Sequence, residues 1–561
     1  MIGKRMLEAI VVVVLLAALG WPALATVHDA IRGESNPSGG LVTPIEGGAA
    51  IRPWRLAGET LRLVATTELL ALPIGIALAF LLFRTDLPGR TLWRALLALM
   101  ACVPMPLQAS GWLGGFGNLG RSQALGSEPI LVGRFGAAFV HAVACLPWIV
   151  WIVGIGLLSV EPELEEAAMF DMSTFRIAWS VTLRRSLGSL AGAALAVAVL
   201  TAGDMTVTDL LAIRTYAEEA YLQFGIGNGP GAASATALPP LILLGTLIVV
   251  GTNRLMNADP ARILSNFTSA PIRRLHGWRI PLGFVVALIL GLLIGLPLYS
   301  LIWRAGRVKG NAALGLAPYW SIGGLAGTLR ASLADVLGPA FRRPLRSPLV
   351  ASLLWGAVGS GAATTFAWVL AWLCRKPGPW RAIAALATAL ALAVPGPVAG
   401  MALVLAYHDV QWIYSTPVIL CLAYFVRIGP YALLLLWPAL RAIPEEAFES
   451  AELDGLGPLG QAWSVALPYT SRAIGLAWAV TFVLALGELP ASGLLVPPGL
   501  STLTSRVWDL LHIGVESRLA GIALITLTIF AISGGLVAFG LSRIRNDRGP
   551  DVVRYRGSTS P

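Results

Sequence analysis

The fold of this chain follows from a stretch that occurs twice, first as Trp179-Ser180-Val181-Thr182-Leu183 and again as Trp463-Ser464-Val465-Ala466-Leu467. The offset is 284 residues, because Val181 corresponds to Val465. The same offset relates Gly203-Asp204 to Gly487-Glu488. A second match at one offset favours duplication over chance. The chain is therefore predicted to contain two similar halves.

Composition places these halves in a membrane. The chain has 561 residues, of which 56% are hydrophobic and 12% charged, and its mean hydropathy is +0.75. A soluble domain has roughly 25% charged residues, so a soluble globular protein is excluded. The net charge of +10 comes from short Lys and Arg clusters beside apolar runs, which argues against nucleic-acid binding. The four cysteines contain no CxxC pair, so neither a disulfide framework nor a metal site is predicted.

Apolar runs of about 18 residues or more are long enough to cross a bilayer as helices. Twelve such runs divide equally between the halves. They predict an all-α polytopic membrane protein of about 12 transmembrane helices, arranged as two parallel six-helix repeats. The predicted spans are residues 7–27, 58–83, 92–114, 135–158, 187–211, 237–256, 279–303, 347–373, 382–406, 415–440, 472–496 and 517–541.

Basic residues predict which side each loop faces. Most Lys and Arg fall in segments that are cytosolic if the N-terminus is inside, so both termini are predicted in the cytosol. The long outer connection 304–346 also holds basic residues, but long loops translocate largely regardless of charge. Lys4-Arg5, the apolar run behind it and Ala23-Leu24-Ala25 are also compatible with a cleaved signal peptide. The equivalent run at 279–303 lacks a cleavage context, which favours a retained first span.

A hydrophilic stretch precedes each pentapeptide. It contains Pro162-Glu163-Leu164-Glu165-Glu166-Ala167-Ala168 in the first half and Pro444-Glu445-Glu446-Ala447-Phe448-Glu449-Ser450-Ala451 in the second. Proline in the first turn, carboxylates at the positive helix end and alanines beyond predict a short helix in each. Gly455 tolerates the left-handed conformation that ends a helix. Two such loops on one cytosolic face favour a docking surface for a partner with matching pseudo-symmetry over a solvated connector.

The second loop resembles the permeases of ABC importers, whose cytosolic motif is Glu-Ala-Ala, three residues, Gly, nine residues and Ile-x-Leu-Pro. Here Glu449-Ser450-Ala451 is followed after three residues by Gly455, and after nine more by Val465-Ala466-Leu467-Pro468. The resemblance implies that this loop is a coupling helix, which seats in a groove of an ATPase subunit and transmits its closure to the membrane spans.

The first half carries a degenerate copy of this motif. Glu166-Ala167-Ala168 is followed by Met172 where Gly is expected, the spacer is one residue short, and Arg184 replaces the closing Pro. A Met does not favour the left-handed conformation, so we expect the chain to leave this helix at a different angle. The two ATPase contacts are therefore predicted to be unequal.

The fused layout and two further segments narrow the resemblance to the permeases of ferric-iron importers. One segment is Leu486–Leu495 with Pro497-Pro498-Gly499, and the other is Thr206–Leu210 with Arg214–Glu219. The predicted function is therefore an inner-membrane permease subunit that forms the pathway for a solute, with ferric iron as the first expectation. Fused permeases for thiamine, aminoethylphosphonate and other small solutes share this architecture and stay open as alternatives.

The resemblance also implies the partners. No Gly-x-x-x-x-Gly-Lys-Ser/Thr phosphate-binding motif is present, so the chain is predicted to bind no cofactor and to be no enzyme, while ATP is used by a separate subunit. Two copies of a cytosolic ABC ATPase, a periplasmic or extracellular solute-binding protein and membrane lipid are the expected partners. The expected domains are a first permease half over 1–260 with its core at 57–256, a second over 278–545 with its core at 347–541, and a cytosolic tail over 546–561.

Two carboxylates in apolar surroundings are the candidates for the translocation pathway. Asp204 and Glu488 hold matched positions in the repeat, and ionisable groups at membrane depth are functional candidates by default. Their oxygens would suit a passing cation. The alternative is that each lies at a helix end and bonds a neighbouring backbone group or arginine. His141, His408 and Arg427 are expected to make structural hydrogen bonds.

Two other classes of membrane protein fit less well. A secondary transporter would need no paired cytosolic Glu-Ala-Ala loops and more often has inverted repeats. A membrane enzyme would need a catalytic motif such as His-Glu-x-x-His or Gly-x-Ser-x-Gly, and neither occurs. No catalytic or metal-binding residue is therefore predicted.

Overall fold

The computed structural model describes residues 2–33, 52–118, 120–124, 126–225, 245–246, 249–250, 272–308, 310, 318–337, 347–513 and 516–546. Within these ranges the chain is almost entirely helical, as predicted, and its regular strands form one antiparallel pair, β1 (Arg307–Val308) with β2 (Tyr319–Trp320). The first half contains α1 (Ile2–Leu15), η1 (Leu16–Gly20), α2 (Trp21–Gly33), α3 (Arg52–Arg84), α4 (Arg90–Ala101), α5 (Met105–Phe116), α6 (Arg121–Ala124), α7 (Gly133–Leu158), α8 (Pro162–Ala168), α9 (Thr174–Ile177), η2 (Ala178–Leu183), α10 (Leu187–Ala202), α11 (Thr206–Leu210) and α12 (Tyr216–Gly225).

The second half repeats this order of elements. Its helices are η3 (His276–Trp278), α15 (Arg279–Ala305), α16 (Ile322–Leu337), α17 (Pro348–Leu373), α18 (Pro379–Ala393), α19 (Gly396–Tyr407), α20 (Gln411–Tyr414), α21 (Val418–Arg441), α22 (Glu445–Leu453), α23 (Pro458–Gln461), η7 (Ala462–Ala466), α24 (Leu467–Gly487), η8 (Ser492–Leu494), α25 (Leu503–Ile513) and α26 (Glu516–Asn546). The duplication seen in the pentapeptides therefore extends to the order of the helices.

Each half is built on three long helices that pack against one another. In the first half these are α3, α7 and α10, and in the second they are α17, α21 and α24. Glycines allow the close approach: a Cβ atom on Gly359 of α17 would lie 2.9 Å from the Tyr424 ring on α21. Small residues at helix contacts are typical of membrane bundles, where packing takes the place of the hydrophobic driving force.

The described residues do not confirm the exact number of twelve predicted spans. Among the described residues, seven helices are long and apolar enough to cross a membrane, or up to nine if each of two bent pairs counts as one span. Leu187–Ala202 and Ser517–Ile532 are apolar but shorter. The predicted span 237–256 and the tail 546–561 lie almost wholly outside the described residues.

The predicted spans 92–114 and 382–406 are each formed by a bent pair of helices. The chain turns by 102° between α4 and α5 and by 107° between α18 and α19. The same pattern stands at both breaks, Val103-Pro104-Met105-Pro106 and Val394-Pro395-Gly396-Pro397. Proline lacks an N–H and forces the residue before it out of the helical region, so each helix must end there.

The first helix of each half packs on the opposite half. The α1–η1–α2 helix contacts α17, α19 and α21, while α15 contacts α5 of the first half. Hydrogen bonds fix this exchange: Trp21 donates to the Ala406 carbonyl at 2.9 Å, and the Tyr407 hydroxyl donates to the Ala17 carbonyl at 2.7 Å. The halves are therefore held together on both sides by exchanged helices.

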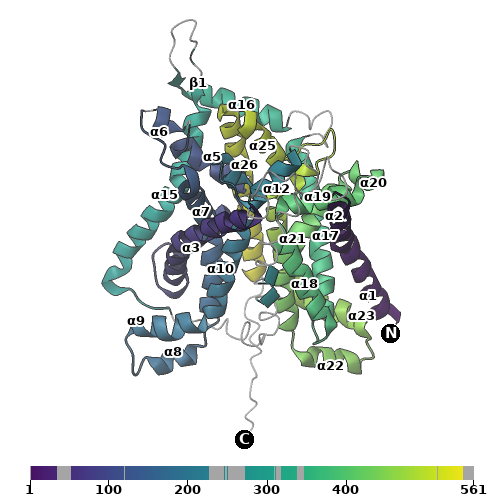
Figure 1. Cartoon of the computed structure of the whole chain (residues 1–561). Coiled ribbons are helices and arrows are strands. Elements are labelled where there is room, and N and C mark those ends of the chain that lie inside the picture. The colour runs from purple at the N-terminus through teal and green to yellow at the C-terminus, as the bar shows by residue number, and fades with distance from the viewer. Residues whose placement is uncertain are drawn as a thin grey trace.

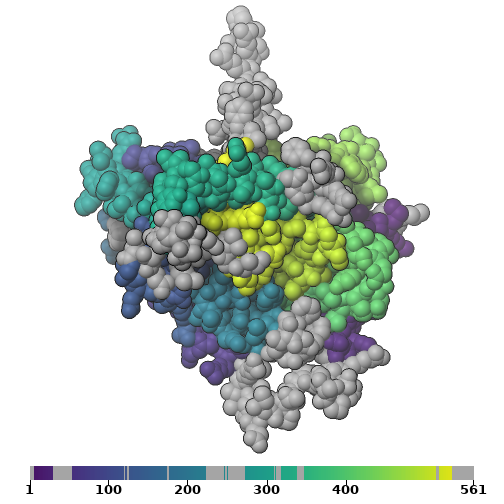
Figure 2. Space-filling view, turned by 90° about the horizontal axis from the view of Figure 1, so that it is seen from above, coloured from purple at the N-terminus to yellow at the C-terminus, as the bar shows by residue number. Residues whose placement is uncertain are grey.

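The two ends of the bundle differ. The short helices α8 and α22 lie at one end, which we call the α8/α22 face, and α12, α16 and α25 lie toward the other, the α12/α25 face (Figure 1). The connection 304–346, predicted as a loop, contains the β1–β2 hairpin and α16 in its described part. Seen from above in Figure 2, yellow C-terminal residues lie between the blue first half and the green second half.

Candidate functional site

The two predicted loop helices are present and occupy equivalent places. Helix α8 follows α7 and begins at Pro162, and α22 follows α21 and begins directly after Pro444. Each leads through a second short helix, α9 or α23, toward the next long helix. Both lie on the α8/α22 face (Figure 1). A partner that contacts one of them can therefore contact the other from the same side.

The ends of the two helices differ as predicted. Gly455 follows α22 with a φ of +80°, and the next N–H, that of Leu456, donates to the Ala451 carbonyl at 3.0 Å. Met172 holds the corresponding place in the first loop without a positive φ, and its N–H donates to the Ala168 carbonyl at 2.9 Å. Because Gly tolerates the left-handed conformation and Met does not, the chain leaves α8 and α22 in different conformations.

An aromatic side chain anchors α22 to the bundle. Phe448 is 5% exposed, and its ring centroid lies 5.8 Å from that of Trp372 at the end of α17. The guanidinium carbon of Arg375 lies 3.7 Å from the centroid of the same Phe448 ring. Such a cation–π contact contributes about 0.5–2 kcal/mol, depending on its exposure. Helix α22 is thus joined to α17 and to the residues just beyond it.

A buried ion pair anchors α8 at the equivalent position. Glu165 precedes the Glu166-Ala167-Ala168 triplet, just as Phe448 precedes the triplet of the second loop, and it pairs with Arg84 at the end of α3. Both side chains are fully buried. Thr182 donates a hydrogen bond to the other oxygen of Glu165. This role of Glu165 was not predicted from the sequence, although its match to the apolar Phe448 indicates an inward-facing position.

Arg273 ties this ion pair to the start of the second half. Its guanidinium lies 3.5 Å from Glu165 and donates to the Thr182 hydroxyl at 3.1 Å. Its backbone pairs with the chain just after α3, where its N–H donates to the Arg84 carbonyl at 2.9 Å. Helix α8 is therefore fixed both to its own half and to the segment that enters α15.

The most exposed large apolar side chains of the two loops stand at matched positions. Phe170 and Leu453 stand two residues beyond Ala168 and Ala451, and each is 90% exposed. Single exposed apolar side chains are common on protein surfaces, so it is the recurrence at matched positions that marks these two residues. The repeat spacing is the sequence signal that marks these two residues. The predicted loop residues divide by exposure: Glu166, Ala167, Glu449, Gly455 and Pro468 are exposed, Ala168 and Leu467 half-buried, and Ala451 buried.

The repeated pentapeptides form π-helical turns in both halves. These are η2 and η7, which stand between the loop helices and the long helices α10 and α24. The tryptophans that open the pentapeptides, Trp179 and Trp463, are 71% and 69% exposed. Single π-helical turns are rare and frequently lie at functional sites. The strongest sequence repeat is therefore also a shared departure from α-helical geometry.

Asp204 and Glu488 both cap short helical turns. An oxygen of Asp204 accepts the Val207 N–H of α11 at 2.9 Å and lies 3.2 Å from Nε2 of His141. Glu488 accepts the N–H groups of Ala491 and Ser492 at 2.9 and 2.8 Å. The geometry is that of the alternative in which each carboxylate lies at a helix end and bonds neighbouring backbone.

Long side chains satisfy the carbonyls that the two helix breaks release. Arg427 donates to the carbonyls of Val394 and Ala391 at 2.7 and 3.2 Å, while Gln108 donates to the Val103 carbonyl at 2.9 Å. The structural hydrogen bonds expected of Arg427 are confirmed. The same holds for His141 and for His408, whose Nδ1 lies 3.1 Å from the Leu405 carbonyl.

The halves meet beside these breaks. Helix α12 packs on α19, and α25 packs on α5, so each half covers the bent pair of the other. Trp508 Nε1 donates to the Tyr221 hydroxyl at 3.4 Å, and the two rings are edge to face at 6.1 Å. Nε2 of His512 lies 3.1 Å from a carboxylate oxygen of Asp209. Side chains of both halves therefore come together near the α12/α25 face.

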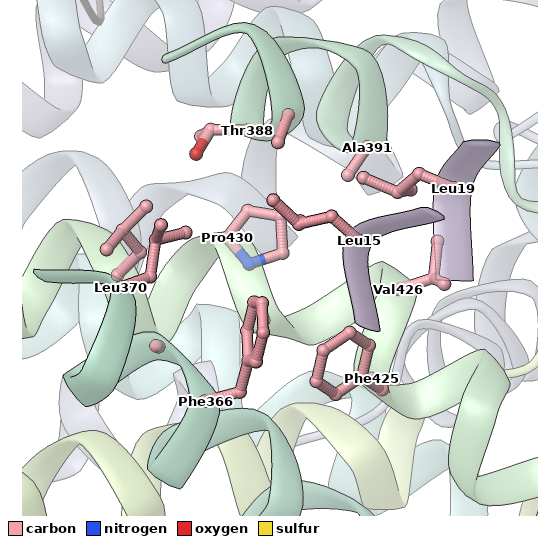
Figure 3. A pocket seen from close by; sticks show the side chains of 13 residues that line it. Leu15, Leu19, Phe366, Leu370, Thr388, Ala391, Phe425, Val426 and Pro430 are labelled. Atoms are coloured by element: carbon pink, nitrogen blue, oxygen red, sulfur yellow. The ribbon is translucent and has the colours of Figure 1, made fainter. Parts of the chain in front are cut away.

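A small cavity elsewhere has no polar character that would suit a charged solute. It has a volume of about 40 Å³ and lies where α1 and η1 pack on the second half. Leu15, Leu19, Phe366 and Pro430 line it, and Thr388 adds a hydroxyl (Figure 3). The cavity belongs to the packing of the exchanged N-terminal helix.

Comparison with known proteins finds similarity in the second half of the chain. Residues 363–548 match the family described as "Binding-protein-dependent transport system inner membrane component". The chain is also similar to the putrescine transport system permease protein PotI of Escherichia coli strain K12, with 25% identity over 171 residues. The same protein from strain O6:H1 gives the same values. The match covers 29% of this chain and 60% of the relatives' own length.

Proposed function

We propose that this chain is the membrane-spanning permease of an ATP-binding-cassette importer. Its residues 363–548 match the binding-protein-dependent transport system inner membrane components. One observation carries the proposal: α8 and α22 lie on one face and present Phe170 and Leu453 at matched positions, each 90% exposed. Two exposed apolar side chains at matched positions on one face suit two copies of the same partner. Two copies of an ABC ATPase on the cytosolic side are that partner.

The anchors of the loops explain how the ATPase would move the membrane helices. Helix α8 is tied to the end of α3 through Glu165 and Arg84, and α22 is tied to the end of α17 through Phe448 and Trp372. A rigid contact at the loop then transmits a displacement directly to the long helix. Since α3 and α17 are equivalent in the repeat, closure of an ATPase dimer would move both halves together.

The two faces of the bundle have different partners in this importer. If the α8/α22 face is cytosolic, the α12/α25 face receives solute from a binding protein outside the inner membrane. ATP is bound and hydrolysed by the partner subunits, so the chain itself needs no cofactor. The predicted cytosolic termini agree with α1, which begins near the α8/α22 face (Figure 1).

Two cationic solutes are the first candidates for the cargo. Ferric iron is favoured by the resemblance of Leu486–Leu495 to fused iron permeases, and putrescine by the similarity to a putrescine permease. Uptake of both labelled compounds by cells that carry the permease, its ATPase and its binding protein decides between them. Thiamine and aminoethylphosphonate come next if neither enters.

Copurification of the ATPase tests the docking surface. We expect Leu453→Glu and Phe170→Glu each to reduce the ATPase recovered with the tagged chain, because a charge cannot enter an apolar groove without a partner. Ile130→Glu is the matched control, since Ile130 is also exposed, at 62%, but precedes α7 and so lies away from α8. Full recovery of the ATPase with both loop variants, in correctly inserted protein, would refute the proposal.

A further inference from the structure

The junction of the two halves contains an uneven set of charges. We call it the junction cluster and define it by Asp209, Arg214, Glu218, Glu219, Tyr221, Trp508 and His512. The first half contributes three carboxylates to this cluster and the second contributes one imidazole. On the α25 side, Arg506 is already paired with Asp335 of α16, at 2.9 Å. The cluster therefore has an excess of negative charge.

Two of the three carboxylates have close partners. Arg214 donates to Glu219 at 2.8 Å, and His512 lies 3.1 Å from Asp209. Glu218 differs, because it is 7% exposed and its buried oxygen Oε2 accepts no hydrogen bond within the described part of the chain. A carboxylate oxygen that is buried without a hydrogen bond is costly, so a bound cation that donates to it would reduce the cost.

Helix α12 also carries an aromatic side chain close in sequence to Glu218. Glu218 and Tyr221 are three residues apart and so share one face of α12. Tyr221 in turn contacts Trp508 across the junction of the halves. A carboxylate next to aromatic faces is a combination that binds alkylammonium groups, by a charge-assisted hydrogen bond and cation–π attraction.

We propose that the junction cluster binds the ammonium group of a small organic amine, such as an alkyl diamine, as it enters the translocation pathway. Glu218 pairs with the ammonium, and Tyr221 and Trp508 cover its methylene groups. A hard metal ion would need several oxygen or nitrogen donors together, and no group of three such side chains suited to a metal occurs among the described residues. This inference rests on the proposed function and specifies its cargo.

Uptake kinetics with the complete importer test the proposal. Labelled putrescine is the amine probe and ferric citrate the metal probe, each with wild type, Glu218→Gln and Asp509→Asn. Asp509 is a matched control, because it is an exposed carboxylate on α25 outside the cluster. We expect Glu218→Gln to raise the KM for putrescine uptake about tenfold or more, since it removes a charge-assisted hydrogen bond. Asp509→Asn should leave KM unchanged.

A second variant and a second measurement separate the possible failures. Tyr221→Leu should also raise the KM for putrescine while the ATPase copurifies normally. Unchanged putrescine kinetics in Glu218→Gln, or uptake of iron without uptake of any amine, would overturn the inference and leave the importer proposal standing. Loss of ATPase association and of all ATP-dependent uptake in the wild type would overturn the proposed function itself.

Discussion

At the scale of single residues, equivalent positions in the two halves use different chemistry for one structural purpose. Glu165 and Phe448 each hold a loop helix against the end of a long helix, the first through Arg84 and the second through Trp372. Removal of one partner of a buried ion pair leaves an uncompensated charge, whereas a packed apolar contact tolerates hydrophobic replacements of similar volume. The first loop is therefore the more sensitive to loss of one charge.

Removal of Arg84 tests this difference. Arg84→Met leaves Glu165 buried with Arg273 at 3.5 Å, and we expect a loss of about 3 kcal/mol of stability, seen as a lower unfolding temperature in detergent. The double variant Arg84→Met, Glu165→Leu should recover most of this loss. Arg62→Met is the control, because Arg62 is 65% exposed in its pair with Glu59. Equal effects of the two Arg variants would contradict the prediction.

The protonation of Glu218 gives stability a pH dependence. Helix α12 lies outside the candidate spans, and burial raises the pKa of Glu218 from 4.5 to about 7, with Arg214 opposing the shift and Glu219 and Asp209 adding to it. The folded chain holds this proton more tightly than the unfolded chain, so the stability from Glu218 is present below pH 4.5 and lost as the pH rises through 7.

Glu218→Gln should therefore stabilise the protein more at pH 8 than at pH 5, because the amide is never charged. Thermal unfolding of both proteins at the two pH values measures this difference. The control variant Asp509→Asn should show no such difference between the two pH values. A constant difference between the proteins at both pH values would mean that Glu218 does not titrate in this range.

Among the structural elements, the short segments that join long helices determine the shape of the α8/α22 face and of the α12/α25 face. Both halves contain the loop helices, the π-helical turns and the Pro-x-Pro breaks. The backbone groups that these segments leave free are bonded by nearby backbone or by one long side chain. Of these segments, the end of α22 depends most directly on one residue, because the φ of Gly455 is +80°. Nothing lies within 4 Å of a Cβ added at Gly455, so a substitution acts only through the backbone.

Gly455→Ala should destabilise the left-handed conformation at the end of α22 by about 1 kcal/mol. It should therefore reduce the amount of ATPase that copurifies with the chain. Met172→Ala should have no such effect, since Met172 already has a negative φ. The amounts of ATPase recovered with the two variants provide the measurement. Equal losses would show that the two ATPase contacts do not differ in the way that the motif predicts.

At the scale of the whole molecule, the exchanged helices make the two halves one assembly. The N-terminal helix packs on the second half, α15 packs on the first, and α12 and α25 meet between them. Contacts of this kind do not require a continuous chain. They require only that both halves be present in the same membrane.

Coexpression of the halves as two chains, divided between residues 260 and 278, tests this arrangement. We expect the second half to copurify with a tagged first half, because Trp21 and Tyr407 still join them. Deletion of residues 2–33 from the first chain should reduce the recovery several-fold. Equal recovery with and without this segment would show that the exchanged N-terminal helix does not hold the halves together.

Hydropathy and the internal repeat were enough to predict an α-helical membrane protein with a duplicated architecture, because both can be read from the order of residues without knowing their contacts. The sequence also predicted the loop helices and the role of Gly455, since capping and φ preferences are local. The tertiary structure alone decided the partners of Glu165, the exchange of first helices and the junction cluster. Arg84 and Glu165 are 81 residues apart, and Asp209 and His512 are 303 apart. Which distant side chains meet depends on helix packing, and packing follows from all the contacts of the bundle together.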